Sequence, residues 1–388
     1  MTALVSPYLM PTYPPQAVTF VRGEGTVLWD DHGKRYLDFL AGIGVTSLGH
    51  ANPVVADAIA EQARTLLHVS NLYGTTVGPE VAATLDRLIG GPAGKVFFAN
   101  SGAEANECAI KLARKWGGRG RHVVLSAYGS FHGRTLATLH ATGQPAKHEA
   151  FQPLPEGFRH VAYSDLAALE AAVTPDVVAV LLETVQGEGG VQVPDPSYLV
   201  GVRRLCDERG LLFIVDEVQT GLGRTGRWFG FQHAGIQPDV VTLAKALGNG
   251  VPIGACWARA EVADAFVAGD HGTTLGGQPL AAAAARAVLA EMERLDVPTR
   301  AAEAGERLAK GLGALPGVAA VRGQGLLLAA ELETPSAKDV ASAALAAGLV
   351  VNPVTGSALR FEPSLLVTDD EIDEALSILA TVLAEGAR

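Results

Sequence analysis

Residues 211–216 read LLFIVD and residues 239–245 read DVVTLAK, and each apolar run ends directly at a charged residue. Two more apolar runs end at polar residues: residues 95–101 read KVFFANS, and residues 177–183 read VVAVLLE. A charged group beside a buried strand costs free energy, although each one alone is explained equally well as a cap of the next element. In open α/β sheets, binding sites lie outside the carboxyl ends of the strands. We therefore expect one crevice that holds the four ends, with Ser101, Glu183, Asp216 and Lys245.

The pattern around these runs predicts an α/β fold with a mostly parallel sheet covered by helices. Near-continuous apolar runs that alternate with helical patterns are typical of parallel strands buried on both faces. The expected helices are residues 79–90, 102–116, 197–209 and 279–294. The expected strands are residues 95–99, 122–126, 177–182, 211–215, 239–244 and 253–258.

The two ends of the chain predict a second, smaller α+β domain. Residues 20–40 have the pattern of an antiparallel hairpin region, and short strands alternate with helices after about residue 295. We expect residues 1–50 to be the N-terminal segment of this small domain. Residues 51–290 would form the large domain, and residues 291–388 the C-terminal part of the small one.

Composition excludes several classes of protein. The 388 residues are 48% hydrophobic with a net charge of −11 and no basic block, which argues against nucleic acid and anionic membranes as partners. The sequence has no apolar stretch long enough to span a bilayer and no signal peptide pattern. Cys108, Cys206 and Cys256 lie far apart without metal-ligand spacing, so we expect a reduced cytoplasmic protein without a metal site.

Three of the four strand ends carry residues that are candidates for cofactor binding or catalysis. Ser101, followed by Glu104, predicts a capping box at a helix start, whose free N–H groups suit a phosphate. Asp216 needs a cationic partner if it is buried, and a protonated ring nitrogen would serve. Desolvation would make Lys245 a neutral nucleophile towards carbonyls. These are the parts that pyridoxal phosphate requires, although each has a plainer explanation: a capped helix, a capped loop and a surface lysine.

One glycine-rich motif is a poor candidate for a nucleotide site. Residues 221–226 read GLGRTG and match GxGxxG, but residues 216–220 separate them from the strand. The sequence that follows does not predict a helix, and no acidic residue stands at the distance that a dinucleotide site requires. The chain also lacks a P-loop.

The motifs in combination resemble the class III pyridoxal-phosphate aminotransferases of fold type I. Within this family the chain is most similar to the acetylornithine aminotransferases of arginine biosynthesis. The resemblance runs from about Val21 to the C-terminus. It rests on the segments NSGAEANECAIKLAR (100–114), FHGRT (131–135), ETVQGEGG (183–190), VDEVQTGLGRTG (215–226), TLAKALGNGVPIGA (242–255), HGTTLGGQPL (271–280) and LRFEPSL (359–365).

The resemblance implies roles around the cofactor ring. Lys245 would form the Schiff base with pyridoxal 5'-phosphate and later move a proton. Asp216 would pair with the protonated ring nitrogen, which makes the ring an electron sink. Gln219 would contact the phenolic oxygen, and Val218 and Phe131 would sandwich the ring, although Phe131 suits an ordinary core position equally well.

Further roles concern the phosphate and the partner subunit. The helix start at Ser101, Gly102 and Ala103 would bind the phosphate, with backbone N–H groups from the last two. Glu183 would lie near the polar edge of the ring. Thr274 would reach the phosphate of the other subunit, so the resemblance implies a homodimer with shared active sites.

Two arginines are expected to select the substrates. Both substrates of a transaminase of this kind carry carboxylates, which the planar fork of arginine binds with two hydrogen bonds. By resemblance, Arg134, assisted by Thr273, would hold the α-carboxylate of N-acetylornithine. Arg360 would hold the α-carboxylate of glutamate or 2-oxoglutarate. Glu188 would pair with Arg360 while the first substrate is bound and swing away for the second.

Three residues depart from the usual family pattern. Thr184 stands where the family usually has proline, Gln278 where it usually has asparagine, and Glu362 where a small residue is common. Glu362 lies two residues from Arg360, so a regular strand would place both on one face. We expect Glu362 to point away from the cleft, because Pro363 disturbs the strand.

The expected reaction moves the δ-amino group of N-acetylornithine to 2-oxoglutarate by a ping-pong route. Ile43 stands where the similar ornithine aminotransferases carry a tyrosine that helps to hold a free α-amino group. Isoleucine cannot accept a hydrogen bond from an ammonium group, which favours an acylated amine. Succinyl-diaminopimelate, succinylornithine and a carrier-linked lysine are equally compatible with Ile43. Ornithine, GABA, an aminomutase reaction and a binding protein without catalysis remain alternatives.

Overall fold

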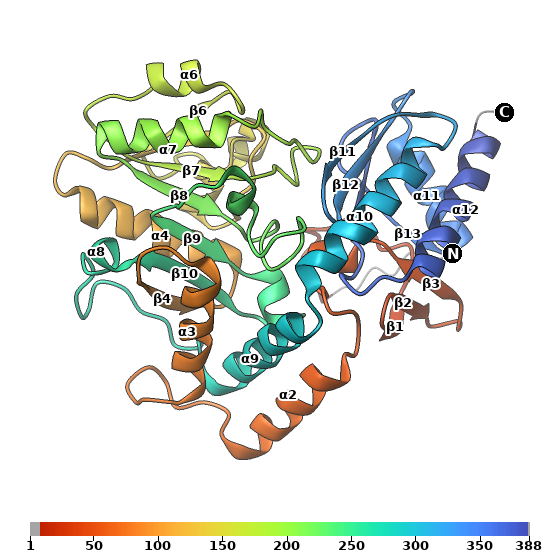
Figure 1. The fold of residues 1–388 in the computed structure, drawn as a ribbon, viewed down its shortest axis with the longest axis horizontal. Coiled ribbons are helices and arrows are strands. Elements are labelled where there is room, and N and C mark those ends of the chain that lie inside the picture. Colours follow the sequence, from red (N-terminus) through yellow and green to blue (C-terminus); the bar gives the residue numbers. More distant parts are fainter. Residues whose placement is uncertain (1–7, 387–388) are drawn as a thin grey trace.

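The computed structural model describes residues 8–386, and its centre is a seven-stranded sheet (Figure 1). Only β10 runs antiparallel to its neighbours, so the predicted mostly parallel sheet is confirmed. One strand, β6, was not predicted. The strands follow in the order β4 (Gly94–Ala99), β10 (Gly254–Arg259), β9 (Val240–Leu243), β8 (Leu212–Asp216), β7 (Val177–Glu183), β5 (Val123–Ala127) and β6 (Phe158–Val161).

Helices bury both faces of this sheet. Along β8, Leu212 and Ile214 join one apolar cluster with α4, whereas Phe213 and Val215 join another with α3, α7 and α9. This alternation explains why the strands read as continuous apolar runs. The helices of this part are α2 (Pro53–Thr65), α3 (Val77–Ile89), α4 (Gly102–Gly117), α5 (Leu136–Ala141), α6 (Leu166–Ala171), α7 (Tyr198–Arg209), α8 (Ala260–Ala263) and α9 (Pro279–Arg294).

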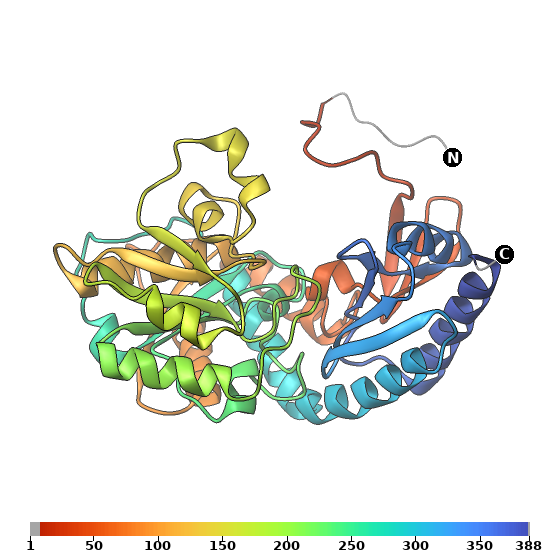
Figure 2. The same ribbon diagram turned by 90° about the horizontal axis from the view of Figure 1, so that it is seen from above.

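A second group of elements lies beside this body in both views (Figures 1 and 2). The N-terminal and C-terminal segments share one of its sheets, because β3 pairs with β13 in parallel. The first sheet contains β1 (Phe20–Glu24), β2 (Val27–Asp30), β3 (Arg35–Asp38) and β13 (Leu349–Val350). The second contains β11 (Val318–Gln324), β12 (Leu327–Leu332), β15 (Ala358–Phe361) and β14 (Asn352–Pro353). Its helices are α1 (Ala41–Gly44), α10 (Val297–Gly313), α11 (Ala337–Ala347) and α12 (Asp369–Gly386).

The division into residues 1–50, 51–290 and 291–388 stays a prediction, and its first seven and last two residues lie outside the described range. Four short 3-10 turns complete the described elements: η1 (Pro145–Lys147), η2 (Glu149–Phe151), η3 (Gly230–Ala234) and η4 (Lys245–Gly248). The GxGxxG segment 221–226 lies in turns and is followed by η3, so it does not begin an α-helix. Within residues 8–386, no helix has the length and apolarity needed to cross a membrane.

Candidate active site

One cavity of about 690 Å³ collects the strand ends that the sequence singled out. Its lining includes Ser101 after β4, Glu183 at the end of β7, Asp216 at the end of β8 and Lys245 after β9. These four strands are parallel to one another, because β10 is antiparallel to both β4 and β9. The predicted convergence of the four ends is therefore confirmed. The N-terminal segment closes the opposite wall of the cavity with Ile43.

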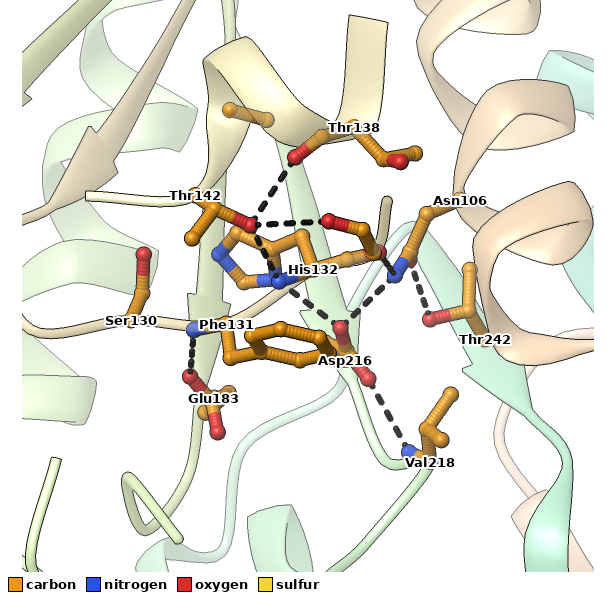
Figure 3. A network of polar contacts seen from close by, with 12 residues as sticks. Asn106, Ser130, Phe131, His132, Thr138, Thr142, Glu183, Asp216, Val218 and Thr242 are labelled. Atoms are coloured by element: carbon orange, nitrogen blue, oxygen red, sulfur yellow. Dashed lines mark hydrogen bonds and ion pairs between the residues drawn. The ribbon is translucent and has the colours of Figure 1, made fainter. Parts of the chain in front are cut away.

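Asp216 is the centre of a buried polar network (Figure 3). Its Oδ2 accepts a hydrogen bond from Asn106 Nδ2 at 2.8 Å and lies 2.8 Å from His132 Nδ1. Its Oδ1 accepts from the backbone N–H of Val218 at 3.0 Å. Asn106 is held in turn by Thr242, whose hydroxyl donates to Asn106 Oδ1 at 2.7 Å. These contacts fix the orientation of the carboxylate at the cavity wall.

Asn106 and His132 were not predicted from the sequence as site residues. Both lie inside the family motifs at residues 100–114 and 131–135. Asn106 falls five residues after the helix cap, and His132 follows the expected ring contact Phe131. The available signal for Asn106 was its spacing, because it lies three and four residues from Gly102, Ala103, Ala109 and Ile110 and so shares a helix face with them.

Glu183 lies behind Phe131 and not in open solvent. The N–H of Phe131 donates to Glu183 Oε1 at 2.9 Å, and the N–H of Gly187 donates to Oε2 at 3.3 Å. Burial raises the pKa of Glu183 to about 7, against the opposing effect of the nearby His132. Glu183 thus fixes the backbone on which the Phe131 ring is carried into the cavity.

The start of α4 faces the cavity with Gly102 and Ala103. Ser101 caps the helix, since its Oγ accepts from the N–H of Glu104 at 3.2 Å. The predicted capping box is only half formed, because Glu104 accepts from the N–H of Asn100 at 2.7 Å and not from that of Ser101. A Cβ at Gly102 would lie 2.9 Å from both methyl groups of Val218, so this position is restricted to glycine.

Lys245 lies in the cavity wall directly after β9. Its φ of 42° is in the left-handed region, which is uncommon for residues other than glycine and is enriched at functional sites. Burial lowers the pKa of its amine, although the nearby Glu362 opposes this effect. The position contradicts the alternative of a surface lysine and gives the amine the environment of a nucleophile.

Arg360 and Glu188 form the expected ion pair, with 2.5 Å between Arg360 Nη1 and Glu188 Oε1. Arg360 Nη2 donates to Asn352 Oδ1 at 2.8 Å, and Gln219 Oε1 lies 3.5 Å from Nη1. Burial disfavours ionisation of Glu188, but Arg360 outweighs it and holds the pKa of Glu188 below its ordinary value. Only Glu188 of the pair is partly exposed, with 32% of its side chain accessible against 1% for Arg360.

Glu362 is not among the described residues that line the cavity, as expected, but it has not turned away from Arg360. Its side chain is fully buried, and its Oε2 lies 3.2 Å from Arg360 Nε. β15 ends at Phe361, and the N–H of Glu362 donates to Phe39 O at 2.8 Å. Burial lowers the pKa of the nearby Arg224 to about 10, although the Glu362 carboxylate opposes this effect.

The donor end of the cavity carries two cations near one ring. The guanidinium carbon of Arg134 lies 5.6 Å from the centre of the Phe131 ring, and Lys147 Nζ lies 5.4 Å from it. All three line the cavity together with Ile43. Ile43 is 37% exposed, so it is not an ordinary core residue. Lys147 was not singled out from the sequence, because nothing in its local pattern marks it.

Thr273 and Thr274 do not reach this cavity within one chain. They line a second cavity of about 780 Å³ together with Leu72 and Tyr73. Thr273 Oγ1 accepts from the N–H of Gly276 at 3.1 Å and lies 3.4 Å from Asn100 Nδ2. The single chain therefore leaves the expected contact of Thr274 untested.

The two other departures have local roles. Gln278 begins α9, and its side chain accepts from the N–H of Val69 at 3.0 Å and donates to Asn71 Oδ1 at 3.3 Å. Thr184 is buried, and its hydroxyl packs against Gly230, where a Cβ would lie 2.1 Å from Thr184 Oγ1. Gln278 thus ties the 69–71 segment to α9, whereas Thr184 is accommodated by a glycine.

Comparison with known proteins identifies the family. Residues 8–383 match the family described as Aminotransferase class-III, and the chain belongs to it. The acetylornithine aminotransferase of Caldanaerobacter subterraneus is 49% identical over 97% of this chain and 98% of the relative. That of Gloeobacter violaceus is 50% identical over 97% of this chain and 96% of the relative.

Solved structures of the same kind have the same fold. The ornithine aminotransferase from Toxoplasma gondii superposes with a TM-score of 0.93 at 34% identity, covering 98% of this chain and 94% of that one. The N-acetylornithine aminotransferase from Stenotrophomonas maltophilia superposes with a TM-score of 0.85 at 36% identity, covering 96% and 98%. The fold is therefore that of the fold type I aminotransferases, as predicted.

Pyridoxal 5'-phosphate is the cofactor that this family implies, and the cavity fits it. A buried carboxylate, Asp216, faces the cavity and would balance a protonated ring nitrogen. The start of α4 at Gly102 offers backbone N–H groups to a phosphate, without a Cβ in the way. Lys245 supplies an amine with a lowered pKa in the same wall.

Proposed function

We propose that this chain is a transaminase that moves the δ-amino group of N2-acetyl-L-ornithine to 2-oxoglutarate. The products are N-acetyl-L-glutamate 5-semialdehyde and L-glutamate, as in arginine biosynthesis. One observation carries the proposal: Lys245 lines a cavity together with Arg134 and Glu188, and Glu188 is paired with the buried Arg360. The near-full-length identity with proteins named acetylornithine aminotransferase supports it.

The cofactor would be held from several sides. Pyridoxal phosphate, when bound, supplies a carbonyl carbon for the amino group and a ring that withdraws electrons. Asp216 would pair with the ring nitrogen through a carboxylate that Asn106 and His132 hold in place. Phe131 and Val218 both line the cavity and would sandwich the ring.

The polar edges of the cofactor have their own partners. Ser101, Gly102 and Ala103 would bind the phosphate at the start of α4, where the helix dipole favours an anion. Gln219 would contact the phenolic oxygen, because its Nε2 is buried without a hydrogen-bond partner among residues 8–386. Glu183 supports the Phe131 backbone at the same edge.

Lys245 would bind the cofactor's carbonyl carbon and afterwards move a proton. Its amine loses charge readily in this cavity, because burial lowers its pKa. Once displaced by the amino group of a substrate, the neutral amine is a base within reach of the reacting carbon.

Two ends of the cavity would take the two substrates in turn. Arg134, with Thr273 of the partner subunit assisting, would bind the α-carboxylate of N-acetylornithine and leave its δ-amine near Lys245. Arg360 stays neutralised by Glu188 during this step. For the second substrate, Glu188 would leave, and Arg360 would bind the α-carboxylate of 2-oxoglutarate with its planar fork.

Ile43 gives the test of the donor. Ornithine places a charged α-amino group where Ile43 has no acceptor, and burial of that charge is costly. We expect kcat/KM for N-acetylornithine to exceed that for ornithine or GABA by ~10²-fold. The Ile43→Tyr variant should narrow this ratio in favour of ornithine. A wild-type protein that prefers ornithine or GABA would contradict the proposed donor.

The active unit is proposed to be a homodimer that works in the cytoplasm. Thr274 would complete the phosphate site of the partner subunit from the second cavity. Leu72 and Tyr73 line the same cavity and are 86% and 72% exposed, as expected for an apolar surface that a second copy covers. The three cysteines are buried and unpaired, which suits a reducing compartment.

A further inference from the structure

Glu362 has no explanation in the proposed reaction, and its burial is unusual. Its side chain is fully buried at the end of β15, and neither carboxylate oxygen has a well-aligned hydrogen bond among the described residues. A buried carboxylate without donors is costly unless positive charge compensates it. Glu362 therefore needs positively charged groups close to its carboxylate.

Two buried guanidinium groups lie beside this carboxylate. Arg360 Nε is 3.2 Å from Glu362 Oε2. A Cβ at Gly44 would lie 3.0 Å from Glu362 Oε1 and 4.0 Å from Arg224 Nε, so both side chains reach the same point. Arg224 donates to Leu326 O at 3.1 Å and to the backbone of residue 363, which leaves Glu362 as its charged neighbour.

Arg360 is thus shared by one partly exposed carboxylate, Glu188, and one fully buried carboxylate, Glu362. Glu188 follows a glycine, is 32% exposed and holds Nη1. Glu362 is fully buried, lies beside Nε and has no path to solvent. Asn352 occupies Nη2, so Nη1 is the position at which partners can be exchanged.

The two positive charges of Arg224 and Arg360 balance the two negative charges of Glu188 and Glu362. With Glu188 in place, Arg224 and Arg360 face two carboxylates. When Glu188 leaves, one positive charge is uncompensated, which is the requirement for binding one substrate carboxylate. Without Glu362, two positive charges would be buried there, and any carboxylate on Arg360 would be bound far more tightly in this low-dielectric site.

We propose that Glu362 sets the affinity for the acceptor: it is a fixed anion that weakens the hold of Arg360 on every exchanging carboxylate. It would weaken the hold on Glu188 and on the dicarboxylate substrate alike. Glu188 can then leave without a large cost, and glutamate can leave after it forms. The inference rests on the proposed function, in which Arg360 binds the acceptor.

A double-mutant comparison tests this with glutarate, a dicarboxylate that has no keto group to react. Its dissociation constant is measured by calorimetry on the cofactor-loaded protein. In a Glu188→Gln background, Glu362→Gln should tighten glutarate binding by ~10-fold or more, since the repulsion is removed. With Glu188 present, Glu362→Gln should tighten glutarate binding by less than about threefold. Glu188 and glutarate compete for Arg360, and the substitution strengthens the binding of both to a similar extent.

The control is Glu291→Gln, which removes a buried carboxylate paired with Arg294 on α9 and should leave glutarate binding unchanged in both backgrounds. Unchanged or weaker binding on Glu362→Gln in the Glu188→Gln background would overturn the inference. Weaker binding in both backgrounds would assign Glu362 only to holding Arg360 in place. An Arg360→Met variant with wild-type affinity for glutarate would contradict the proposed function itself.

Glu362→Gln removes the charged neighbour of Arg224 and can impair folding for that reason alone. Glu362→Asp keeps the charge and withdraws the carboxylate from Arg360 by one CH₂ group. In the Glu188→Gln background it should tighten glutarate binding by an intermediate factor. Absence of any tightening in that variant would overturn the inference as well.

Discussion

At the scale of single residues, Lys245 combines an uncommon backbone with a weakened charge. Its left-handed φ of 42° directs the side chain from the end of β9 into the cavity. Burial lowers its pKa, so the amine is more often neutral than an exposed lysine at the same pH. Residues with an uncommon backbone conformation cluster at functional sites, so the φ of Lys245 supports a functional role.

Replacing this lysine should abolish turnover without unfolding the protein. Lys245→Ala removes the amine that binds the cofactor's carbonyl and moves the proton, so kcat should fall by ~10³-fold or more. The melting temperature should change little, because the side chain lines a cavity and fills no core. Lys95→Ala, an exposed lysine paired with Asp264, is the control and should keep full activity. Turnover retained by Lys245→Ala would make the mechanism untenable.

At the scale of elements, the turn after β8 is tied down by Glu217. Its carboxylate accepts from the N–H groups of Gly230 and Phe231 at 3.0 and 2.9 Å and from the hydroxyl of Thr220 at 2.6 Å. These bonds join the end of β8 to the start of η3. They hold Gln219 at the cavity wall between those two points.

Glu217 should also make stability fall as the pH rises. Burial raises its pKa from 4.5 to about 7, so between these values the folded protein keeps a proton that the unfolded chain releases. The free energy of unfolding should therefore decline across that window by roughly 3 kcal/mol for this group and level off above pH 7. Glu217→Gln should make the decline shallower in urea unfolding, and an unchanged slope would contradict the assignment.

The start of α4 depends on the close approach of β10. A Cβ at Gly254 would lie 2.4 Å from the carbonyl oxygen of Ser101, which is backbone and cannot swing away. Gly254→Ala should destabilise the protein by about 1–3 kcal/mol and move the phosphate site. We expect the dissociation constant of pyridoxal phosphate to rise by ~10-fold, measured by fluorescence titration. Gly356→Ala, with its nearest atom at 3.8 Å on Pro335, should bind the cofactor as the wild type does.

At the scale of the whole molecule, the active site depends on residues from both ends of the chain. The N-terminal segment gives Ile43, the central sheet gives Asp216 and Lys245, and the C-terminal part gives Arg360. The pairing of β3 with β13 joins the first and last of these. In Figure 2 the two parts lie side by side, with the strand ends of the large sheet turned towards the smaller part.

Hybrid dimers test whether two chains share a site. One chain carries Lys245→Ala, and the other carries Thr274→Asp, which places a negative charge where the phosphate is expected. Each homodimer should be inactive. In a mixed dimer, the site with an intact Lys245 receives an intact Thr274 from its partner, so activity should return to about a quarter to a half of that of the wild type. No recovery in purified hybrids would contradict a shared site.

Much of the site could be predicted because its residues stand at the ends of apolar strands. Apolar runs ending at Glu183, Asp216 and Lys245 needed only the rule that parallel strands meet at one edge. The unpredicted β6 reads FRHV, whose polar residues hide its strand character. Only half of the predicted capping box at Ser101 forms, because the Glu104 carboxylate accepts a hydrogen bond from the N–H of Asn100 and not from that of Ser101.

Glu362 could not be placed from the sequence because its position is set by distant residues. The buried Arg224 lies in a glycine-rich turn that the sequence treats as a loop, so its charge was not counted as part of the core. Gly44 leaves the room that the Glu362 carboxylate fills. Three segments far apart in the chain create this position, and no local pattern contains them.

The most direct test of the central claim is the absorbance spectrum of the purified protein during a half-reaction. N-acetylornithine is added without any keto acid, and the yellow band of the lysine-bound cofactor is followed. The account predicts that the band is lost and returns on addition of 2-oxoglutarate, whereas ornithine and GABA act much more slowly. A band that only another amine removes would contradict the donor. A protein that stays colourless after pyridoxal phosphate is added would contradict the site itself.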